Sequence, residues 1–440
     1  MTLEVPKKLQ LKFDNFFKGK EAVIIDPSSS TRATIKRVLS AIGFPIGNIH
    51  IVPDYFQAIE VIKDKMAAII FTAADIGKEK TAEDLLELHL DLIPNRENCV
   101  FMVISKHNSE ASAAAYLDTE VDNYICQPFN TETLQSSVMK AFKQKVMQTP
   151  YDREVCKIKS LIYTKEFDEA KQRAEKSLTM SKDQAWSYFL LGNIEEVQSN
   201  FQGAIDQYKK ALDNDTSHYQ TLSGLMRCYQ SLKMYADAYD AATLLLDQYP
   251  LSINSIPDLI RISLANQKFE DLEKISAVLV QIPDLSPTIK LQISAGLALC
   301  GKHLLKNKNR ELGVKSLKKA LETCDFNPNI ILSVGQTYVD SALYKEAMNV
   351  LNQYDDKLGT MASFKVLELE VFYRTGEKKG HIISLGTQLL KKNIKQPKVY
   401  EIMLEASKEL NRRQDAIEQI VFDATKDYPE LKGHFQKYLG

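Results

Sequence analysis

Two patterns of hydrophobic and polar positions divide the chain. Over the first 147 residues, short and almost wholly apolar runs alternate with segments whose apolar residues recur at helical spacing. The runs lie at 21–26, 48–52, 67–72, 99–105 and 123–127. The helical segments lie at 30–44, 54–65, 81–92, 109–118 and 131–145. Continuous apolar strands that alternate with helices predict a doubly wound, five-stranded parallel sheet of the flavodoxin-like α/β class.

Beyond residue 147 the chain is helical and periodic. Aromatic residues recur at one constant spacing, at Phe167, Phe201, Tyr235 and Phe269. Small residues follow in the same register, at Ala170, Ala204 and Ala238. Each unit holds two amphipathic helices, and we expect its aromatic residue to be buried between them. The register slips by about seven residues around 301–310 and then resumes, so the pattern predicts a solenoid of seven or eight helix pairs over 148–440.

This periodicity resembles the tetratricopeptide repeat (TPR). Leu191-Gly192, Ala204, Tyr208 and Ala211 match one unit of the family pattern, and Tyr229, Ala238, Ala242 and Pro250 match the next. The resemblance implies an all-α superhelix whose concave face binds protein. It assigns ten side chains to that face: Trp186, Phe189, Asn193, Gln220, Arg227, Gln230, Asn254, Arg261, Gln336 and Asp340.

Two groups on this face suggest a partner. Asn193, Arg227 and Arg261 share one position in three successive units, where they could clamp a carboxylate or an acidic peptide. Alternatively they are ordinary solvated polar residues. Trp186 and Phe189 form either a peptide-binding patch or part of the packing between units.

The carboxyl ends of the predicted strands, where ligands of such sheets bind, carry Asp26, Thr72, Ser105 and Gln127. The stretches VIIDPSSSTR and VDNYICQPF resemble a response-regulator receiver domain over residues 20–147. The resemblance implies a phosphoryl-accepting aspartate after the third strand. It also implies two acids that hold Mg²⁺ after the first strand, and a lysine after the fifth.

The chain departs from this receiver pattern at three positions. Pro27 replaces the second acid, Thr72 (or Ala73, in a register shifted by one) stands at the acceptor position, and Gln127 replaces the lysine. Asp26, Ser105 and the aromatic Tyr124 match the family. We therefore expect a degenerate pseudo-receiver that cannot be phosphorylated.

Two carboxylates leave alternatives open. Asp75, three residues beyond the third strand, could fold back as a non-standard acceptor, or it could be a solvated loop acid. Asp26 could retain a role in metal binding, or it could cap the following helix; we favour capping.

Composition and charge narrow the function. The 440 residues have a net charge of −1, and neither residues 1–150 (17 basic, 19 acidic) nor the remainder (39 and 38) has a basic excess. We therefore expect no nucleic-acid partner. No apolar run approaches the roughly 20 residues needed to span a bilayer, and the N-terminus has no apolar signal region. The expected location is the cytoplasm.

Motifs for catalysis or cofactor binding are absent from the sequence. The glycines never form GxGxxG, GxxxxGK or GxSxG, and HExxH is missing. The six cysteines are scattered without a CxxC pair, which favours buried thiols over a metal site. We expect neither a cofactor nor a metal site.

These observations predict an N-terminal extension (1–19), a receiver-like domain (20–147) and a TPR-like domain (148–440). The predicted function is a non-enzymatic signalling adaptor, in which both domains contact protein partners. The alternative is a phosphorelay response regulator that uses Asp75 as its acceptor and the solenoid as its output. An enzyme with an unrecognised site in the solenoid is a weaker third possibility.

Overall fold

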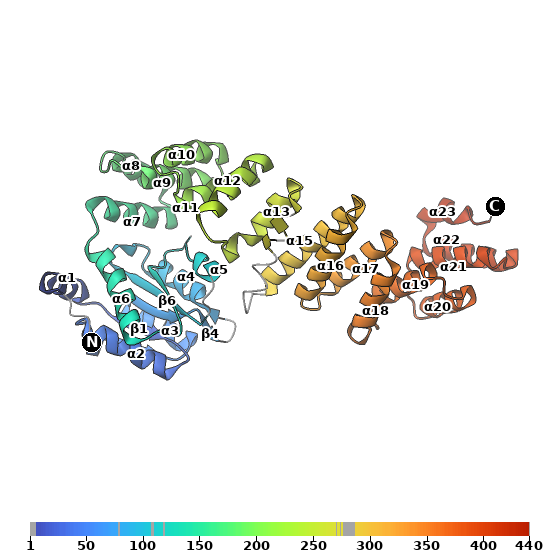
Figure 1. Cartoon of the computed structure of the whole chain (residues 1–440), viewed down its shortest axis with the longest axis horizontal. Coiled ribbons are helices and arrows are strands. Elements are labelled where there is room, and N and C mark those ends of the chain that lie inside the picture. The colour runs from blue at the N-terminus through green and yellow to red at the C-terminus, as the bar shows by residue number, and fades with distance from the viewer. Residues whose placement is uncertain are drawn as a thin grey trace. The chain divides into compact units, whose positions relative to one another are not determined.

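The computed structural model describes residues 6–77, 80–106, 110–117, 119–269, 271–272, 274–275 and 287–439. These residues form two compact units, 6–268 and 269–439 (Figure 1). The first unit contains an α/β domain and the first solenoid segment. The second unit contains the second solenoid segment. Among the described helices, none combines the length and apolar character that crossing a membrane requires.

The α/β domain is built on a parallel sheet with strand order β2-β1-β3-β6-β7. Its strands are β1 (Ala22–Ile25), β2 (Ile49–Val52), β3 (Ile69–Ala73), β6 (Val100–Ser105) and β7 (Asn123–Cys126). The helices after these strands are α2 (Ser29–Ala41), α3 (Tyr55–Lys65), α4 (Ala82–Leu92), α5 (Glu110–Ala114) and α6 (Thr131–Val146). The predicted five-stranded doubly wound fold is confirmed.

Alternate side chains of the strands build two cores. Ile24 and Phe71 face α2 and α6, whereas Val23 and Ile70 face α3 and α4. Every residue of β1, β3 and β6 is buried, because helices cover both faces of the sheet. This burial explains why the three strands read as continuous apolar runs in the sequence.

An additional helix, α1 (Lys7–Phe17), belongs to the first of these cores. Phe13 and Phe17 are fully buried, and the Phe17 ring meets the edge of Phe142 at 4.9 Å. The sequence pattern predicts residues 1–19 as an extension outside the domain. The structure instead shows that α1 completes the hydrophobic core, packing against α6.

A short antiparallel ribbon, β4 (Asp75–Gly77) and β5 (Lys80–Thr81), follows β3 and was not predicted. Asp75 opens this ribbon with an exposed side chain, and its Oδ1 accepts a 2.8 Å hydrogen bond from the backbone N–H of Gly77. The carboxylate is therefore engaged in its own turn.

The first solenoid segment consists of antiparallel helix pairs. Its helices are α7 (Pro150–Tyr163), α8 (Phe167–Ser177), α9 (Ala185–Val197), α10 (Phe201–Asn214), α11 (Tyr219–Ser231), α12 (Tyr235–Gln248) and α13 (Ile256–Ala265). A single-turn 3₁₀ helix, η3 (Ile253–Ser255), precedes α13. Figure 1 shows α7, α9 and α11 on the side of the stack that faces the α/β domain. We call this side, with η3 and α13, the inner face.

The periodic aromatics do not lie where the sequence suggested. Phe167, Phe201 and Tyr235 each open the second helix of a pair and are only partly buried. Phe269 is also only partly buried. The expectation that they are buried between the helices is therefore wrong in degree. The first residue of a helix lies at the end of the pair, where solvent reaches one side of the ring. The alanines three residues later are fully buried instead, at Ala170, Ala204 and Ala238.

The second solenoid segment continues the same pattern. Its helices are α15 (Pro287–Lys306), α16 (Arg310–Thr323), α17 (Pro328–Asp340), α18 (Tyr344–Leu358), α19 (Ala362–Arg374), α20 (Lys379–Lys391), α21 (Pro397–Glu409), α22 (Gln414–Asp427) and α23 (Lys432–Gln436), with η4 (Pro429–Leu431) before α23. The turn between paired helices has one residue in the left-handed region in each unit. These residues are Lys165, Ser199, Lys233, Gln267, Lys308, Ala342, Gly376 and Asn411.

The left-handed residues measure the repeat directly. Successive members are evenly spaced from Lys165 to Gln267, and the step from Gln267 to Lys308 is longer. The predicted slip of the register is thus present at this point of the chain. It coincides with α15, which has 20 residues, whereas α9 and α11 have 13 each.

Candidate functional site

The carboxyl ends of the strands place Asp26 in a buried position. Its Oδ1 accepts a 2.7 Å hydrogen bond from the backbone N–H of Ser28, and the side chain is 4% exposed. Ser28 itself caps α2, since its hydroxyl accepts from the N–H of Thr31. Asp26 therefore supports the capping residue and does not cap the helix itself. Burial raises the pKa of Asp26, although the Ser28 N–H and the cations Lys106 and Arg32 oppose this shift.

The positions that would accept and stabilise a phosphoryl group hold neutral side chains. Thr72 is fully buried, and its hydroxyl donates to the carbonyl of Ala73 at 3.0 Å. The side-chain amide of Gln127 donates to the Thr31 hydroxyl at 3.4 Å, and its backbone N–H donates to the carbonyl of Ser105 at 2.7 Å. Neither Thr72 nor Gln127 supplies a charge for phosphoryl chemistry.

Tyr124 and Ser105 close the same edge of the sheet. The Tyr124 ring stacks on Tyr116 with centroids 5.2 Å apart. Burial raises the pKa of the Tyr124 phenol, and its hydrogen bond with Ser105 partly offsets this shift. Arg32 donates to the backbone carbonyls of Asp26 and Pro27, so the loop after β1 is fixed by its own helix.

An open cavity of about 640 Å³ lies beside this edge. Hydroxyl, amide, cationic and two apolar side chains line it, and none of the lining residues carries a carboxylate: Ser30, Thr31, Thr34, Arg37, Lys106, Gln127, Pro128, Phe129, Asn130 and Thr131. Among the described residues, no group of three or more His, Cys, Asp or Glu side chains has the arrangement to hold a metal ion. Asp26 thus lacks nearby acidic partners of the kind that a Mg²⁺ site requires.

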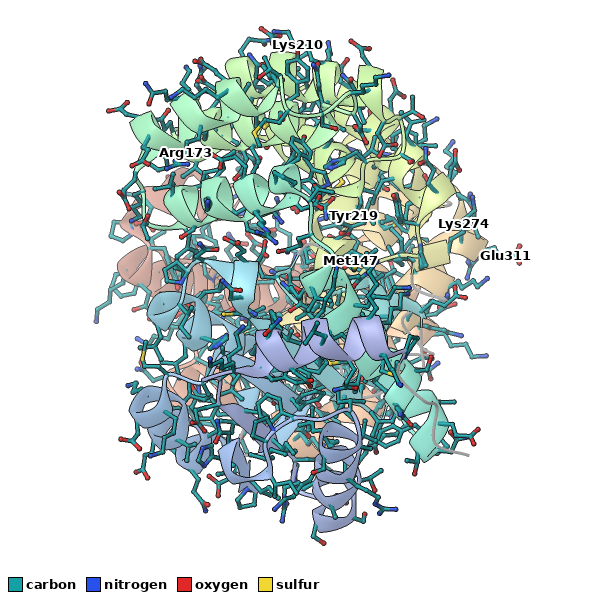
Figure 2. The ribbon with its side chains drawn as sticks, turned by 90° about the vertical axis from the view of Figure 1, so that its left-hand side faces the viewer. Met147, Arg173, Lys210, Tyr219, Lys274 and Glu311 are labelled. Carbon is teal, nitrogen blue, oxygen red and sulfur yellow. The ribbon has the colours of Figure 1, made fainter. Side chains whose placement is uncertain are left out.

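The inner face of the first solenoid segment lies against the α/β domain. Lys159 of α7 forms a 3.0 Å ion pair with Glu120, and the Tyr163 hydroxyl donates to Asp91 at 2.6 Å. The side-chain amide of Gln220 donates to the carbonyl of Leu117 at 3.1 Å. In Figure 2, Met147 lies where the α/β domain meets the helices, and Arg173 and Lys210 lie on the helices above it.

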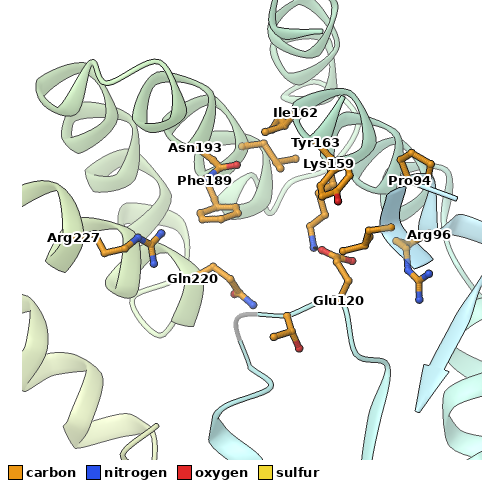
Figure 3. Close-up of a pocket in the computed structure, with 13 residues that line it drawn as sticks. Pro94, Arg96, Glu120, Lys159, Ile162, Tyr163, Phe189, Asn193, Gln220 and Arg227 are labelled. Carbon is orange, nitrogen blue, oxygen red and sulfur yellow. Dashed lines mark hydrogen bonds and ion pairs between the residues drawn. The ribbon is translucent and has the colours of Figure 1, made fainter. Parts of the chain in front are cut away.

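A cavity of about 270 Å³ remains between the two parts of this unit (Figure 3). Its lining contains Asn193 and Arg227 of the predicted clamp, together with Phe189. Arg261, the third member of the clamp, is not among the lining residues. In Figure 3, Lys159 and Glu120 point toward each other.

The two arginines of the predicted clamp are bound by acids of the solenoid itself. Arg227 donates from Nε to Glu196 Oε1 at 2.8 Å and from Nη2 to Oε2 at 3.3 Å. Arg261 contacts Asp258 at 3.2 Å, and the side-chain amide of Gln230 bridges these two groups. An incoming carboxylate would therefore have to compete with these acids for the guanidinium groups.

The aromatic pair Trp186 and Phe189 is largely engaged in packing. Phe189 is 8% exposed and stacks on Tyr208 at 5.8 Å. Trp186 is partly buried, lies edge-on to His218 at 4.6 Å, and carries the Lys159 ammonium 4.4 Å from its ring centroid. Packing between units thus explains Phe189 better than it explains Trp186.

A buried Arg–His pair of the α/β domain was not predicted from the sequence. Arg96 is 2% exposed and its Nη1 lies 2.5 Å from His89 Nδ1, while His89 Nε2 contacts the carbonyl of Ala67 at 2.7 Å. Burial, with the nearby Arg96 charge, lowers the pKa of His89 to about 3, so the ring is neutral. No local pattern distinguishes these two residues from surface residues in the sequence.

No protein-family model matches the chain, and no curated protein matches it. Solved structures show distant likeness. A structure of Pseudomonas aeruginosa pilF shares 16% identity, covering 50% of this chain and 97% of that chain, with a TM-score of 0.32. A tetratricopeptide repeat protein from Parabacteroides merdae shares 15% identity over 57% and 97% of the two chains, with a TM-score of 0.33.

RcsB from Salmonella enterica serovar Typhimurium, solved on a promoter with the phosphomimetic BeF3−, shares 16% identity with this chain. The match covers 44% of this chain and 91% of RcsB, with a TM-score of 0.24. Likeness at this level carries no argument about what the chain binds.

Proposed function

We propose that the chain is a non-enzymatic adaptor, in which a phosphorylation-incompetent receiver-like domain and a TPR-like solenoid bind protein partners. The observation that carries the proposal is the chemistry at the end of β3. Thr72 is buried with its hydroxyl engaged, in a place where a phosphoryl acceptor would need an exposed carboxylate. We place this role in the cytoplasm, where the six free thiols stay reduced.

The phosphorylation claim can be tested on the full chain. Incubation with a small-molecule phosphodonor and Mg²⁺ should give no acid-stable, hydroxylamine-sensitive acyl phosphate, as measured by intact-mass spectrometry. Thr72→Asp restores only one of the three missing groups, and it should also remain unmodified because Pro27 and Gln127 leave the metal and the phosphoryl oxygens without support. Stable incorporation by the natural chain would contradict the proposal.

The second candidate function is a phosphorelay regulator with Asp75 as its acceptor. Its support is the exposure of the Asp75 carboxylate next to the end of β3. The turn hydrogen bond from Gly77 and the neutral side chains of Thr72 and Gln127 weigh against it. Incorporation that Asp75→Asn abolishes, with Asp64→Asn as an exposed control, would establish this alternative.

The adaptor claim is tested by affinity capture with the full chain. The equivalent inner positions of the second solenoid segment carry Gln336 and Glu370, whose side chains lie 3.2 Å apart, and Lys398 pairs with Glu370 at 3.0 Å. We expect a captured protein to be lost with Gln336→Ala/Lys398→Ala. It should be retained with Lys426→Ala, at the end of α22. Capture of no protein by the natural chain would contradict the adaptor role.

A further inference from the structure

The segment that follows α5 crosses the inner face of the first solenoid segment. The side-chain amide of Asn254, in η3, donates to the carbonyl of Ala115 at 3.1 Å. The amide of Gln220, in α11, donates to the carbonyl of Leu117 at 3.1 Å. Lys159, in α7, donates to the Glu120 carboxylate at 3.0 Å. These residues therefore contact three units of the solenoid. They run antiparallel to the order of the units, because Ala115 contacts the last of the three and Glu120 contacts the first.

These contacts have the form of peptide recognition. Two amide side chains bind backbone carbonyls, which any sequence supplies, and one ammonium binds a carboxylate, which only an acidic residue supplies. The two amide donors, Gln220 and Asn254, occupy the same repeat position as Trp186 in three successive units, so they belong to one row of the inner face. Trp186 makes no hydrogen bond to the segment in this row, but its ring lies beneath the ammonium of Lys159, which binds Glu120.

The carboxylate of Glu120 is held in its charged form. Burial alone would raise the pKa of Glu120, but the ammonium of Lys159, with smaller effects from Arg96 and Lys145, lowers this pKa overall. The Lys159 and Glu120 side chains are 29% and 31% exposed. Solvent therefore reaches the ion pair, and the contact is open to competition by another acidic group.

We propose that Ala115, Leu117 and Glu120 are built-in occupants of the inner face, and that the external partner is an extended acidic peptide that presents the same acceptors. Such a peptide presents two backbone carbonyls two residues apart and a carboxylate three residues after the second. Its binding displaces the α/β domain from the solenoid. The inference rests on the proposed adaptor function, and it adds the chemistry of the partner and an internal competitor.

The internal segment competes as a tethered ligand. A tethered segment acts at an effective concentration on the order of millimolar, so a free peptide with the same contacts binds the natural chain weakly. The apparent affinity equals the affinity of the open inner face multiplied by the fraction of molecules in which that face is open. Weakening the internal segment alone should therefore strengthen the binding of a peptide that retains the natural contacts.

The two partners of the Lys159–Glu120 ion pair allow a sharp experiment on the full chain. The probe is a labelled synthetic peptide of residues 112–123, and fluorescence anisotropy measures its binding. Glu120→Gln opens an intact inner face and should raise the peptide's affinity about tenfold over the natural chain. Lys159→Gln breaks the same internal ion pair but also removes the partner of the peptide carboxylate. The peptide should therefore bind Lys159→Gln about tenfold more weakly than it binds Glu120→Gln.

Matched controls separate recognition from general loosening. A peptide with glutamine in place of its Glu120 should bind Glu120→Gln and Lys159→Gln alike. Asn329→Ala, at the equivalent repeat position in α17, should leave peptide affinity unchanged, whereas Gln220→Ala/Asn254→Ala in the Glu120→Gln chain should remove binding. Trp186 is the sole tryptophan, so its emission should change when the peptide binds.

Equal peptide binding by the natural chain, Glu120→Gln and Lys159→Gln would overturn the inference, as would absence of binding to a folded Glu120→Gln chain. Thermal denaturation establishes that each variant is folded. This result would leave the adaptor role standing, because that role is judged separately by capture through Gln336 and Lys398. Conversely, if the peptide affinities of the variants follow the predicted order, the inference about the inner face would stand even if capture found no partner on the second solenoid segment.

Discussion

The ring of Tyr208 lies directly on the backbone of Gly192. A Cβ atom added at Gly192 would come within 2.5 Å of two carbons of that ring. The opposite edge of the ring meets Gly224 of α11, where an added Cβ would lie 2.7 Å from it. A single buried tyrosine of α10 therefore joins two successive units, and glycine on both neighbouring helices makes room for it.

This contact predicts a specific cost for a methyl group. Gly192→Ala should lower the free energy of unfolding by about 1–3 kcal/mol, because the Tyr208 ring cannot withdraw from between α9 and α11. Urea denaturation followed by circular dichroism measures the change. Gly380→Ala is the control, since an added Cβ there meets nothing within 4 Å. An equal effect in both variants would show that helix propensity, not crowding, decides the outcome.

The bidentate pair between Arg227 and Glu196 predicts a structural role for Arg227. The repeat register assigns Arg227 to the concave face, either as part of a clamp for an acidic partner or as a solvated polar residue. The structure instead links it to α9, so a double-mutant cycle of Arg227→Ala and Glu196→Ala should give a coupling of about 0.5–1 kcal/mol. The coupling should weaken with salt. Strict additivity of the two substitutions would mean that the pair contributes nothing.

Burial of His218 predicts acid sensitivity of the first solenoid segment. Its Nδ1 accepts from the Thr221 hydroxyl at 2.8 Å and from the Thr221 N–H, which caps α11. Burial lowers the pKa of His218 to about 4, with smaller effects from Asp215, Lys159 and Asp183. The unfolded chain therefore binds more protons below pH 6.5. Stability should fall between pH 6.5 and 4 by up to about 1.4 kcal/mol per pH unit from this residue.

His218→Asn supplies the comparison for this pH dependence. Asparagine is a good N-cap and does not titrate, so this variant should lose less stability between pH 7 and 5 than the natural chain. His89, whose pKa is lowered to about 3, shifts stability in the same direction and remains in both proteins. Exposed His381→Asn is the control. Identical pH profiles for the natural chain and His218→Asn would contradict the assignment.

The left-handed turn residues of neighbouring units form a natural pair of tests. Gly376 has φ of 85° and Ala342 has φ of 56° at equivalent positions. Gly376→Ala should destabilise by about 1 kcal/mol, since alanine resists this conformation and the added Cβ meets no neighbour. Ala342→Gly should change stability in the opposite direction. Changes of the same sign in both variants, measured by urea denaturation, would rule out backbone conformation as the cause.

The sheet could be predicted from the sequence because its buried strands are also continuous apolar runs in the local sequence. Runs with almost no polar residue became β1, β3 and β6, which helices cover on both faces. The α1 helix could not be predicted in the same way. Its Phe17 contacts Phe44 and Phe142, and a pairing between such distant positions leaves no local periodic signal.

The candidate site shows the same limit of local information. The repeat register assigned Gln220 and Asn254 to the concave face, and the structure places both against the α/β domain. The partner of Asn254, Ala115, lies 139 residues away, so the register could not name it. Likewise, the repeat register located Arg227 on its helix but gave no indication that Glu196 binds its guanidinium group.

The additional length of α15 has a rotational consequence. Each helical residue turns the chain by about 100°, so seven residues complete nearly two full revolutions, short by about 20°. A helix of 20 residues therefore begins at almost the same angular position as one of 13, and the chain enters the unit from the same side. Gly301 then faces Leu317 of α16 much as Gly192 faces Tyr208 of α10. An extension by five residues would instead bring the chain into the unit from nearly the opposite side of the helix, because five residues stop well short of a second full turn.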